Sequence, residues 1–129
     1  MTASVVTVAP GQTLREAGDL LRSKHIRQLP VVEGGRLIGI ITDRDLKRAT
    51  PSVLSGIARD EYDRLLDETK VAQLMTREPT TLTSDASLKD AVRIFITQKI
   101  GAIPIVDNAG LVGIVTQIDA LRAFYNTLD

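Results

Sequence analysis

Two short stretches of the chain carry a hydroxyl and a carboxylate at the point where a strand should give way to a helix. The pattern Gly-x-x-Thr-x-x-Asp occupies residues 39–45 and recurs at residues 113–119. A hydroxyl at a helix N-terminus can hold a phosphate or ribose oxygen, and a carboxylate can accept hydrogen bonds from both hydroxyls of a ribose. The glycine lets another group approach the strand backbone closely. The pattern therefore favours a site that recognises a nucleotide without transforming it.

The same spacing also has a purely structural interpretation. Thr-x-x-Asp is the arrangement of a capping box, in which the two side chains satisfy free N–H groups of the first helical turn. Thr13-x-x-Glu16 and Ser87-x-x-Asp90 have the same arrangement. Taken alone, the spacing favours capping, and the preceding glycine is what raises the functional interpretation.

Both stretches belong to a longer repeat. Residues 1–49 align without a gap on residues 75–123, so that Leu14 recurs as Leu88 and Pro30 as Pro104. Each copy, at about 45 to 50 residues, buries little surface alone, and the chain has no cysteine with which to staple a small core. We therefore expect a pseudo-two-fold body in which the copies pack on each other.

Within each copy the pattern predicts strand, helix, strand, turn, strand and helix. In the first copy a strand is predicted at residues 5–8, a helix from Thr13, and a hairpin of residues 29–32 and 37–41. The second hairpin is expected at residues 103–106 and 111–115. These strands are continuously apolar, which indicates that both faces are covered.

The predicted organisation is repeat 1 at residues 1–49, a connecting segment at 50–70 and repeat 2 at 71–129, together forming one compact unit. The connecting segment has no counterpart in either copy. Its spaced apolar residues, among them Tyr62 and Leu66, predict a short amphipathic helix that packs on the body.

Composition excludes several classes of function. Lys and Arg number 16, as do Asp and Glu, and aromatic residues make up 3% of the chain, so neither the charge nor the stacking surface of a nucleic-acid binder is present. No run reaches the roughly 18 to 20 apolar residues of a membrane span, so no membrane is expected and cytoplasmic residence is the default. The single histidine, His25, has no cysteine or serine triad around it, and neither a phosphate-binding loop nor a metal cluster is visible. We expect no enzyme and no metal.

The repeat, the segments Ile26–Val32 and Ile100–Val106, and both Gly-x-x-Thr-x-x-Asp stretches resemble a tandem pair of cystathionine β-synthase (CBS) domains. The resemblance covers nearly the whole chain, and the connection resembles the stand-alone, acetoin-utilisation type of CBS protein. It implies an α/β (α+β) fold in which two small sheets pack together with flanking helices. It also implies homodimers and two clefts between the repeats that bind AMP, ADP, ATP or another adenosyl ligand.

The resemblance carries over to site residues position by position. Thr42 and Asp45 are expected to hold the phosphate or ribose and the ribose diol in the first site, and Thr116 and Asp119 in the second. Around the base the first site has Val6, Ile26, Arg27 and Gln28. The second has Thr80, Ile100, Gly101 and Ala102. Because Gly101 and Ala102 are smaller than Arg27 and Gln28, the second site is predicted to be the better adenine pocket.

Two functions remain open at the level of sequence. The first is a regulatory sensor that binds an adenosyl ligand and modulates an unidentified partner protein, with no cofactor apart from that regulatory ligand. The alternative is a dimerising interaction scaffold with no physiological nucleotide, in which the Thr and Asp residues serve only as caps.

Overall fold

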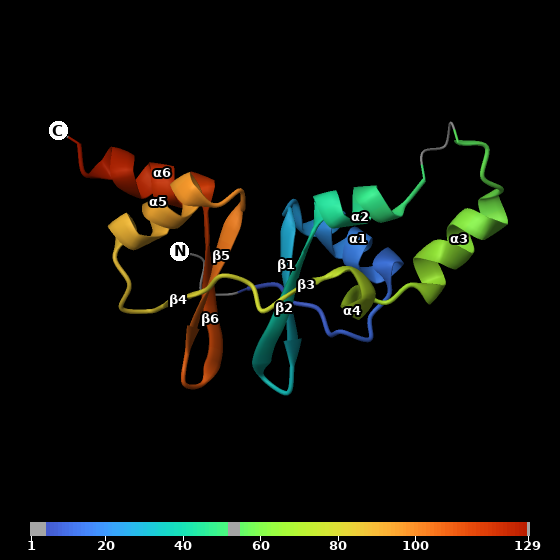
Figure 1. Cartoon of the computed structure of the whole chain (residues 1–129), viewed down its shortest axis with the longest axis horizontal. Helices are drawn as coiled ribbons and strands as arrows, with labels where there is room; N and C mark the ends of the chain where they lie inside the picture. Colours follow the sequence, from blue (N-terminus) through green and yellow to red (C-terminus); the bar gives the residue numbers. More distant parts are fainter. Residues whose placement is uncertain (1–4, 52–54, 129) are drawn as a thin grey trace. The chain divides into compact units, whose positions relative to one another are not determined.

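A computed structural model describes residues 5–51 and 55–128. The chain divides into two compact units, each built on a three-stranded sheet. The first body comprises Val6–Gly34 and Ile38–Glu78, and the second body is centred on residues 79–128. Figure 1 shows each sheet with its own helices. The α+β architecture and the duplication predicted from the sequence are confirmed.

The first body is formed around the predicted hairpin. Strands β1 (Gln28–Glu33) and β2 (Arg36–Thr42) lie beside β3 (Thr76–Arg77) in the order β1-β2-β3, and β2 runs antiparallel to β3. The strand predicted at residues 5–8 is wrong, because only Val8 pairs, through an isolated parallel bridge to Val31. Pro10, close behind Val8, has no N–H with which to extend a ladder.

Helix α1 (Leu14–Lys24) packs its apolar stripe into the core of the first body. Leu14, Ala17 and Leu21 are buried on this stripe. They join a buried cluster that the strands, α4 and nearby loops complete with Val8, Leu29, Val31, Ile41, Val71 and Met75. Spacings of three and four residues place the helical members on one face, which explains why this segment is helical.

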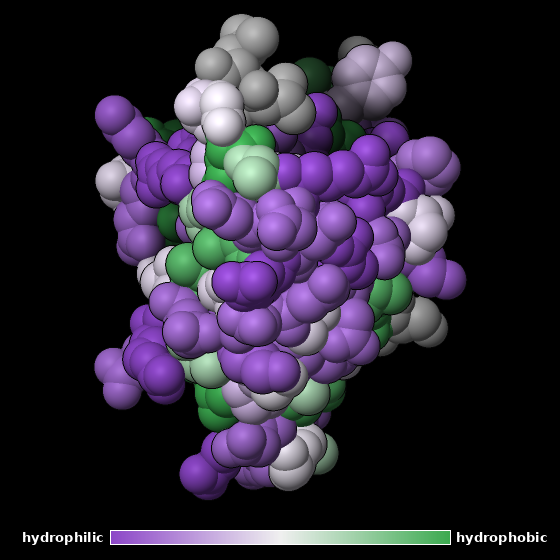
Figure 2. Space-filling model, turned by 90° about the vertical axis from the view of Figure 1, so that its right-hand side faces the viewer, coloured by the Kyte–Doolittle hydropathy of each residue, from purple (hydrophilic) through white to green (hydrophobic). Residues whose placement is uncertain are grey.

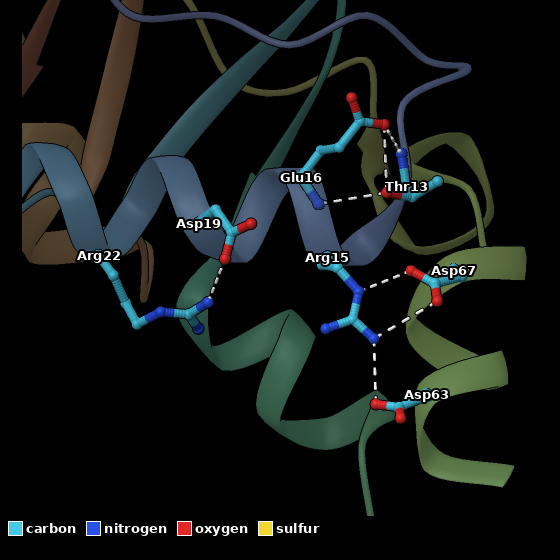
Figure 3. A network of polar contacts seen from close by, with 7 residues as sticks. All are labelled: Thr13, Arg15, Glu16, Asp19, Arg22, Asp63 and Asp67. Carbon is cyan, nitrogen blue, oxygen red and sulfur yellow. Dashed lines mark hydrogen bonds and ion pairs between the residues drawn. The ribbon is translucent and has the colours of Figure 1, made fainter. Parts of the chain in front are cut away.

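The connecting segment contains helix α3 (Arg59–Glu68), which packs beside α1. Arg15 of α1 reaches it, with 2.6 Å from Nε to Oδ1 of Asp67 and 3.1 Å from Nη2 to Oδ1 of Asp63 (Figure 3). These carboxylates hold the pKa of Arg15 above its ordinary value. The pairing is solvent-exposed, so it orients α3 more than it stabilises the fold.

A short helix, α4 (Val71–Leu74), precedes the second copy in sequence but packs on the first body. Its backbone meets the turn before α1: Val71 N–H donates to the Gln12 carbonyl at 2.8 Å, and Ala72 N–H to the Pro10 carbonyl at 3.1 Å. The Leu14 N–H donates in turn to the Thr69 carbonyl at 3.0 Å. The Val71 side chain is thereby fully buried.

The second body has the same arrangement of a three-stranded sheet and two helices, without counterparts of α3 and α4 among the described residues. Strands β4 (Leu82–Thr83), β5 (Ala102–Asp107) and β6 (Gly110–Thr116) form a sheet in the order β4-β5-β6, parallel between β4 and β5 and antiparallel between β5 and β6. Helices α5 (Leu88–Thr97) and α6 (Gln117–Asn126) accompany it. Helix α2 (Asp43–Ala49) is the counterpart of α6 in the first body.

Candidate functional site

Both Thr-x-x-Asp pairs close the first turn of a helix as capping boxes. At α2, Asp45 N–H donates to Thr42 Oγ1 at 3.1 Å, and Thr42 N–H donates to Asp45 Oδ2 at 2.9 Å. At α6 the same two bonds join Thr116 and Asp119 at 3.1 and 3.0 Å. The capping role is therefore present in both copies. A ligand would have to bind through the hydrogen-bonding groups of these side chains that the caps leave free.

The cap leaves hydrogen-bonding capacity on both side chains. Each aspartate bonds the threonine N–H through Oδ2, and a carboxylate can accept about four hydrogen bonds. Thr13, in the equivalent box of α1, also donates its hydroxyl proton to Glu16 Oε1 at 3.1 Å. Within the described ranges, the hydroxyls of Thr42 and Thr116 donate to no acceptor. Each pair therefore retains a hydroxyl donor, which suits a phosphate or ribose oxygen, and a carboxylate acceptor, which suits the hydroxyls of a ribose.

In both copies a loop carbonyl joins this helix start to the strand that precedes the hairpin turn. Asp43 N–H donates to the Arg27 carbonyl at 3.0 Å, and Gln117 N–H donates to the Gly101 carbonyl at 3.3 Å. The structure thus brings residues 26–28 near Thr42, and residues 100–102 near Thr116. The two halves of each candidate site are held together by the backbone.

In the first site the predicted residues differ in exposure. Ile26 and Val6 are half-buried and pack against the core of the first body. Gln28 is half-buried at the start of β1, whereas the Arg27 side chain is exposed. Ile26 and Val6 thus serve at least partly as core residues.

In the second site Ala102 is buried and lies opposite Thr116 in the β5–β6 ladder. Gly101 is exposed and Ile100 half-buried. Thr80 donates its hydroxyl proton to Gln98 Oε1 at 2.8 Å. Gly101 and Ala102 thus stand near Thr116 at the positions where the first copy has Arg27 and Gln28 near Thr42.

The structure gives the glycine of the first pattern a role that the sequence did not reveal. A Cβ on Gly39 would lie 2.6 Å from Met75 Sδ and 2.9 Å from the Thr76 carbonyl oxygen. The space beside this glycine is therefore occupied by Met75 and Thr76 of the same chain, where β2 pairs with β3.

Two glutamines that sequence reasoning missed also shape the second site. Gln117 Nε2 donates to the Ile100 carbonyl at 3.1 Å, and Gln98 accepts the bond from Thr80. Gln117 occupies the variable position after Thr116, where the first copy has Asp43. This difference between the copies is the sequence feature that could have pointed to Gln117.

A pocket of about 170 Å³ lies in the second body, and of the predicted site residues only Asp119 lines it. In the described ranges no group of three or more His, Cys, Asp or Glu side chains could hold a metal ion. None of the helices described is both long and apolar enough to cross a membrane.

Comparison with known proteins places this geometry in a family. The CBS domain model matches residues 1–52 and 71–126. The CBS domain-containing protein YhcV of Bacillus subtilis (strain 168) is 37% identical over 115 residues, which cover 89% of this chain and 75% of that protein. The solved structure of a putative acetoin utilization protein (AcuB) from Vibrio cholerae is 30% identical, with a TM-score of 0.79 and coverage of 98% of this chain and 87% of that one.

Two further similar structures hold adenosyl compounds. CBSX2, a CBS-pair protein of Arabidopsis thaliana, has been solved in complex with AMP; it is 28% identical, with a TM-score of 0.79 over 98% of this chain and 92% of that one. The CBS domain pair of protein MJ0100 has been solved with 5-methylthioadenosine and S-adenosyl-L-methionine; it is 28% identical, with a TM-score of 0.76 over 96% of this chain and 90% of that one. With its duplicated sheets and paired Thr-x-x-Asp helix starts, this chain belongs to the CBS domain family as a tandem pair.

Proposed function

We propose that the chain is a regulatory module that binds an adenosyl ligand such as AMP, ADP or ATP and modulates a partner protein. The observation that carries the proposal is the residual capacity of the two Thr/Asp pairs. Each pair retains a hydroxyl donor and carboxylate acceptors beyond the cap, beside a loop fixed to the same helix start. The adenosyl compounds of CBSX2 and MJ0100 support the choice of ligand class.

The test is a calorimetric titration with AMP, ADP, ATP and S-adenosylmethionine. We expect saturable binding of at least one of them, and Thr116→Ala and Asp119→Ala should weaken it by about tenfold or more. Because Gly101 leaves more room than Arg27, Thr42→Ala and Asp45→Ala should weaken the tighter binding event less.

The matched controls are Ser87→Ala and Asp90→Ala, which remove an equivalent capping box from α5 in the same body. An N-cap threonine or serine contributes about 0.5 to 2 kcal/mol of stability, so the α5 and α6 variants should melt at similarly lowered temperatures. Ligand affinity should fall only in the α6 variants. Equal losses of affinity in both sets would assign the effect to helix stability and refute the proposed contacts.

The competing function is an interaction scaffold, favoured by the fact that every one of these pairs acts as a cap. Under it no ligand raises the melting temperature, whereas a ligand at 100 times its dissociation constant stabilises the folded state by about 2.7 kcal/mol. A thermal-shift series with the same four compounds separates the two functions. A flat series at millimolar concentrations would refute the proposed ligand class.

We further propose that the chain acts as a homodimer. Helix α6 carries Ile118, Leu121 and Tyr125 at spacings of three and four residues, with 60%, 63% and 74% of each residue exposed. This apolar seam on one helical face suits a helix of a second copy.

A further inference from the structure

The pocket of the second body lies between its sheet and its helices. Its floor and walls are mostly apolar, from Leu82 of β4, Leu88 and Ala91 of α5, Ile105 of β5 and Val115 of β6. The remaining lining residues are Thr83, Ser84, Ala86 and Ser87 before α5, and Asp119, Ala120 and Ala123 of α6. With a volume of about 170 Å³ it is large enough for an aliphatic side chain rather than a single water.

The repeat shows what occupies the corresponding place in the first body. The five floor and wall residues are the counterparts of Val8, Leu14, Ala17, Val31 and Ile41. All five belong to the buried cluster that Val71 of α4 completes. Leu14 and Ile41 are fully buried there, whereas their counterparts Leu88 and Val115 are only half-buried. The pocket is therefore the position that α4 fills in the first body.

The backbone groups that hold α4 also have counterparts at the pocket. In the first body the carbonyls of Pro10 and Gln12 and the N–H of Leu14 bind the segment Thr69–Ala72. The equivalent groups at the pocket are the carbonyls of Ser84 and Ala86 and the N–H of Leu88. In the part of the chain that the structure describes, these three groups bond to no other backbone segment.

A charged residue near the pocket follows the same correspondence. Hydrogen bonds from Thr13 and Gln12, followed by the nearby positive charge of Lys70, hold the pKa of Glu16 below its ordinary value. Asp90 is the counterpart of Glu16 and stands in the first turn of α5. Asp90 caps α5 with Ser87 and lies near the positive charges of Lys89 and Arg93, at the position that corresponds to Glu16 near Lys70 in the first body.

We propose that this pocket is a docking groove for a peptide segment of a partner protein with the chemistry of Lys70–Leu74. Such a segment has a basic residue, then a valine-sized side chain in the first turn of a short helix. The valine fills the pocket, the following backbone N–H groups donate to the Ser84 and Ala86 carbonyls, and the basic residue faces Asp90. The groove shares Asp119 with the proposed ligand site at Thr116, and none of the other predicted site residues.

The experiment uses the full chain and a fluorescein-labelled peptide with the sequence of residues 68–76, followed by anisotropy. Saturable binding is expected. Ala123→Trp places a large side chain in the pocket lining from an exposed position and should weaken binding by about tenfold or more. The matched control, Ala109→Trp, lies in the exposed β5–β6 turn and should bind the peptide like the parent chain.

A second peptide, with Asp in place of the valine, keeps the test independent of the folding of any variant. Its affinity should be lower by about tenfold or more, because its Asp would bury a charge in an apolar pocket. Absence of saturable binding, or equal binding of both peptides, overturns the proposal. Undiminished binding to Ala123→Trp overturns it too, since the peptide would then have displaced α4 from the first body. Conversion of a dimer to a monomer by Ala123→Trp, with no peptide binding, would assign the groove to a second copy instead.

Discussion

The residues with the clearest potential for chemistry are also residues that the fold needs. Thr42 and Thr116 cap their helices with the same two backbone bonds as Ser87, which belongs to neither proposed adenosyl site. What separates them is the loop that is bonded to the same helix start, at Arg27 in one copy and Gly101 in the other. A capping threonine is a candidate ligand residue because of this neighbouring loop. Its residue type alone does not distinguish a ligand residue from a simple cap.

Gly39 permits a sharp test at this scale. Gly39→Ala would force the new Cβ against Met75 Sδ and the Thr76 carbonyl, so we expect a loss of about 1 to 3 kcal/mol in the free energy of unfolding. Urea denaturation followed by circular dichroism measures it. Gly11→Ala is the matched control, because nothing lies within 4 Å of a Cβ at that position. Equal stability of the two variants would contradict the tight β2–β3 contact.

At the scale of elements, capping boxes with Ser or Thr at the N-cap begin α1, α2, α5 and α6, whereas α3 begins without a side-chain cap. Two of them, at α1 and α5, hold a carboxylate whose pKa is lowered by hydrogen bonds from its cap partner: Glu16 by Thr13 and Asp90 by Ser87. Helix starts were therefore predictable, because a capping box is a local pattern that needs no distant contact. Which surface each helix then covers depends on residues far away in sequence.

The lowered pKa values of Glu16 and Asp90 predict an acid-sensitive contribution to stability. A carboxyl that is more acidic in the folded state than in the unfolded state stabilises the fold above its unfolded pKa, near pH 4, and loses this contribution as the pH falls further. The double variant Glu16→Gln, Asp90→Asn should therefore be less stable than the parent at pH 7 and converge with it by about pH 2. Melting temperatures recorded from pH 7 to pH 2 test this, and a constant difference across the series would refute it.

At the scale of the whole molecule, the two bodies are unequally covered. The first body has α3 and α4 packed on it, and the surface in Figure 2, which looks onto the right-hand side of Figure 1, is predominantly hydrophilic. The second body instead leaves Ile118, Leu121, Phe124 and Tyr125 of α6 exposed. The two copies thus differ in their surfaces: α3 and α4 pack on the first body, whereas the second body exposes the apolar side chains of α6.

This inequality predicts which surface would form the proposed homodimer. Leu121→Asp puts a charge in the centre of the α6 seam and should convert the dimer to a monomer in light scattering coupled to size-exclusion chromatography. Ala109→Asp, on the exposed β5–β6 turn, should leave the parent mass unchanged. A dimer that persists in Leu121→Asp would place the interface on another surface.

The sequence by itself determined the duplication, both hairpins and the capped helix starts. These features follow from local turn chemistry, side-chain periodicity and a repeat without gaps, all of which can be read without knowing distant contacts. The placement of residues 26–28 and 100–102 beside the Thr/Asp stretches was expected from the resemblance to CBS domains, not from these local patterns. Only the tertiary structure decided that α4 closes the first body although it precedes the second copy, that Gly39 accommodates Met75, and that Val8 pairs alone. The physical reason is that each of these features depends on contacts between segments that lie far apart in sequence. The backbone groups of Pro10–Leu14, for example, hydrogen-bond to Thr69–Ala72, and no local pattern in either segment predicts that pairing.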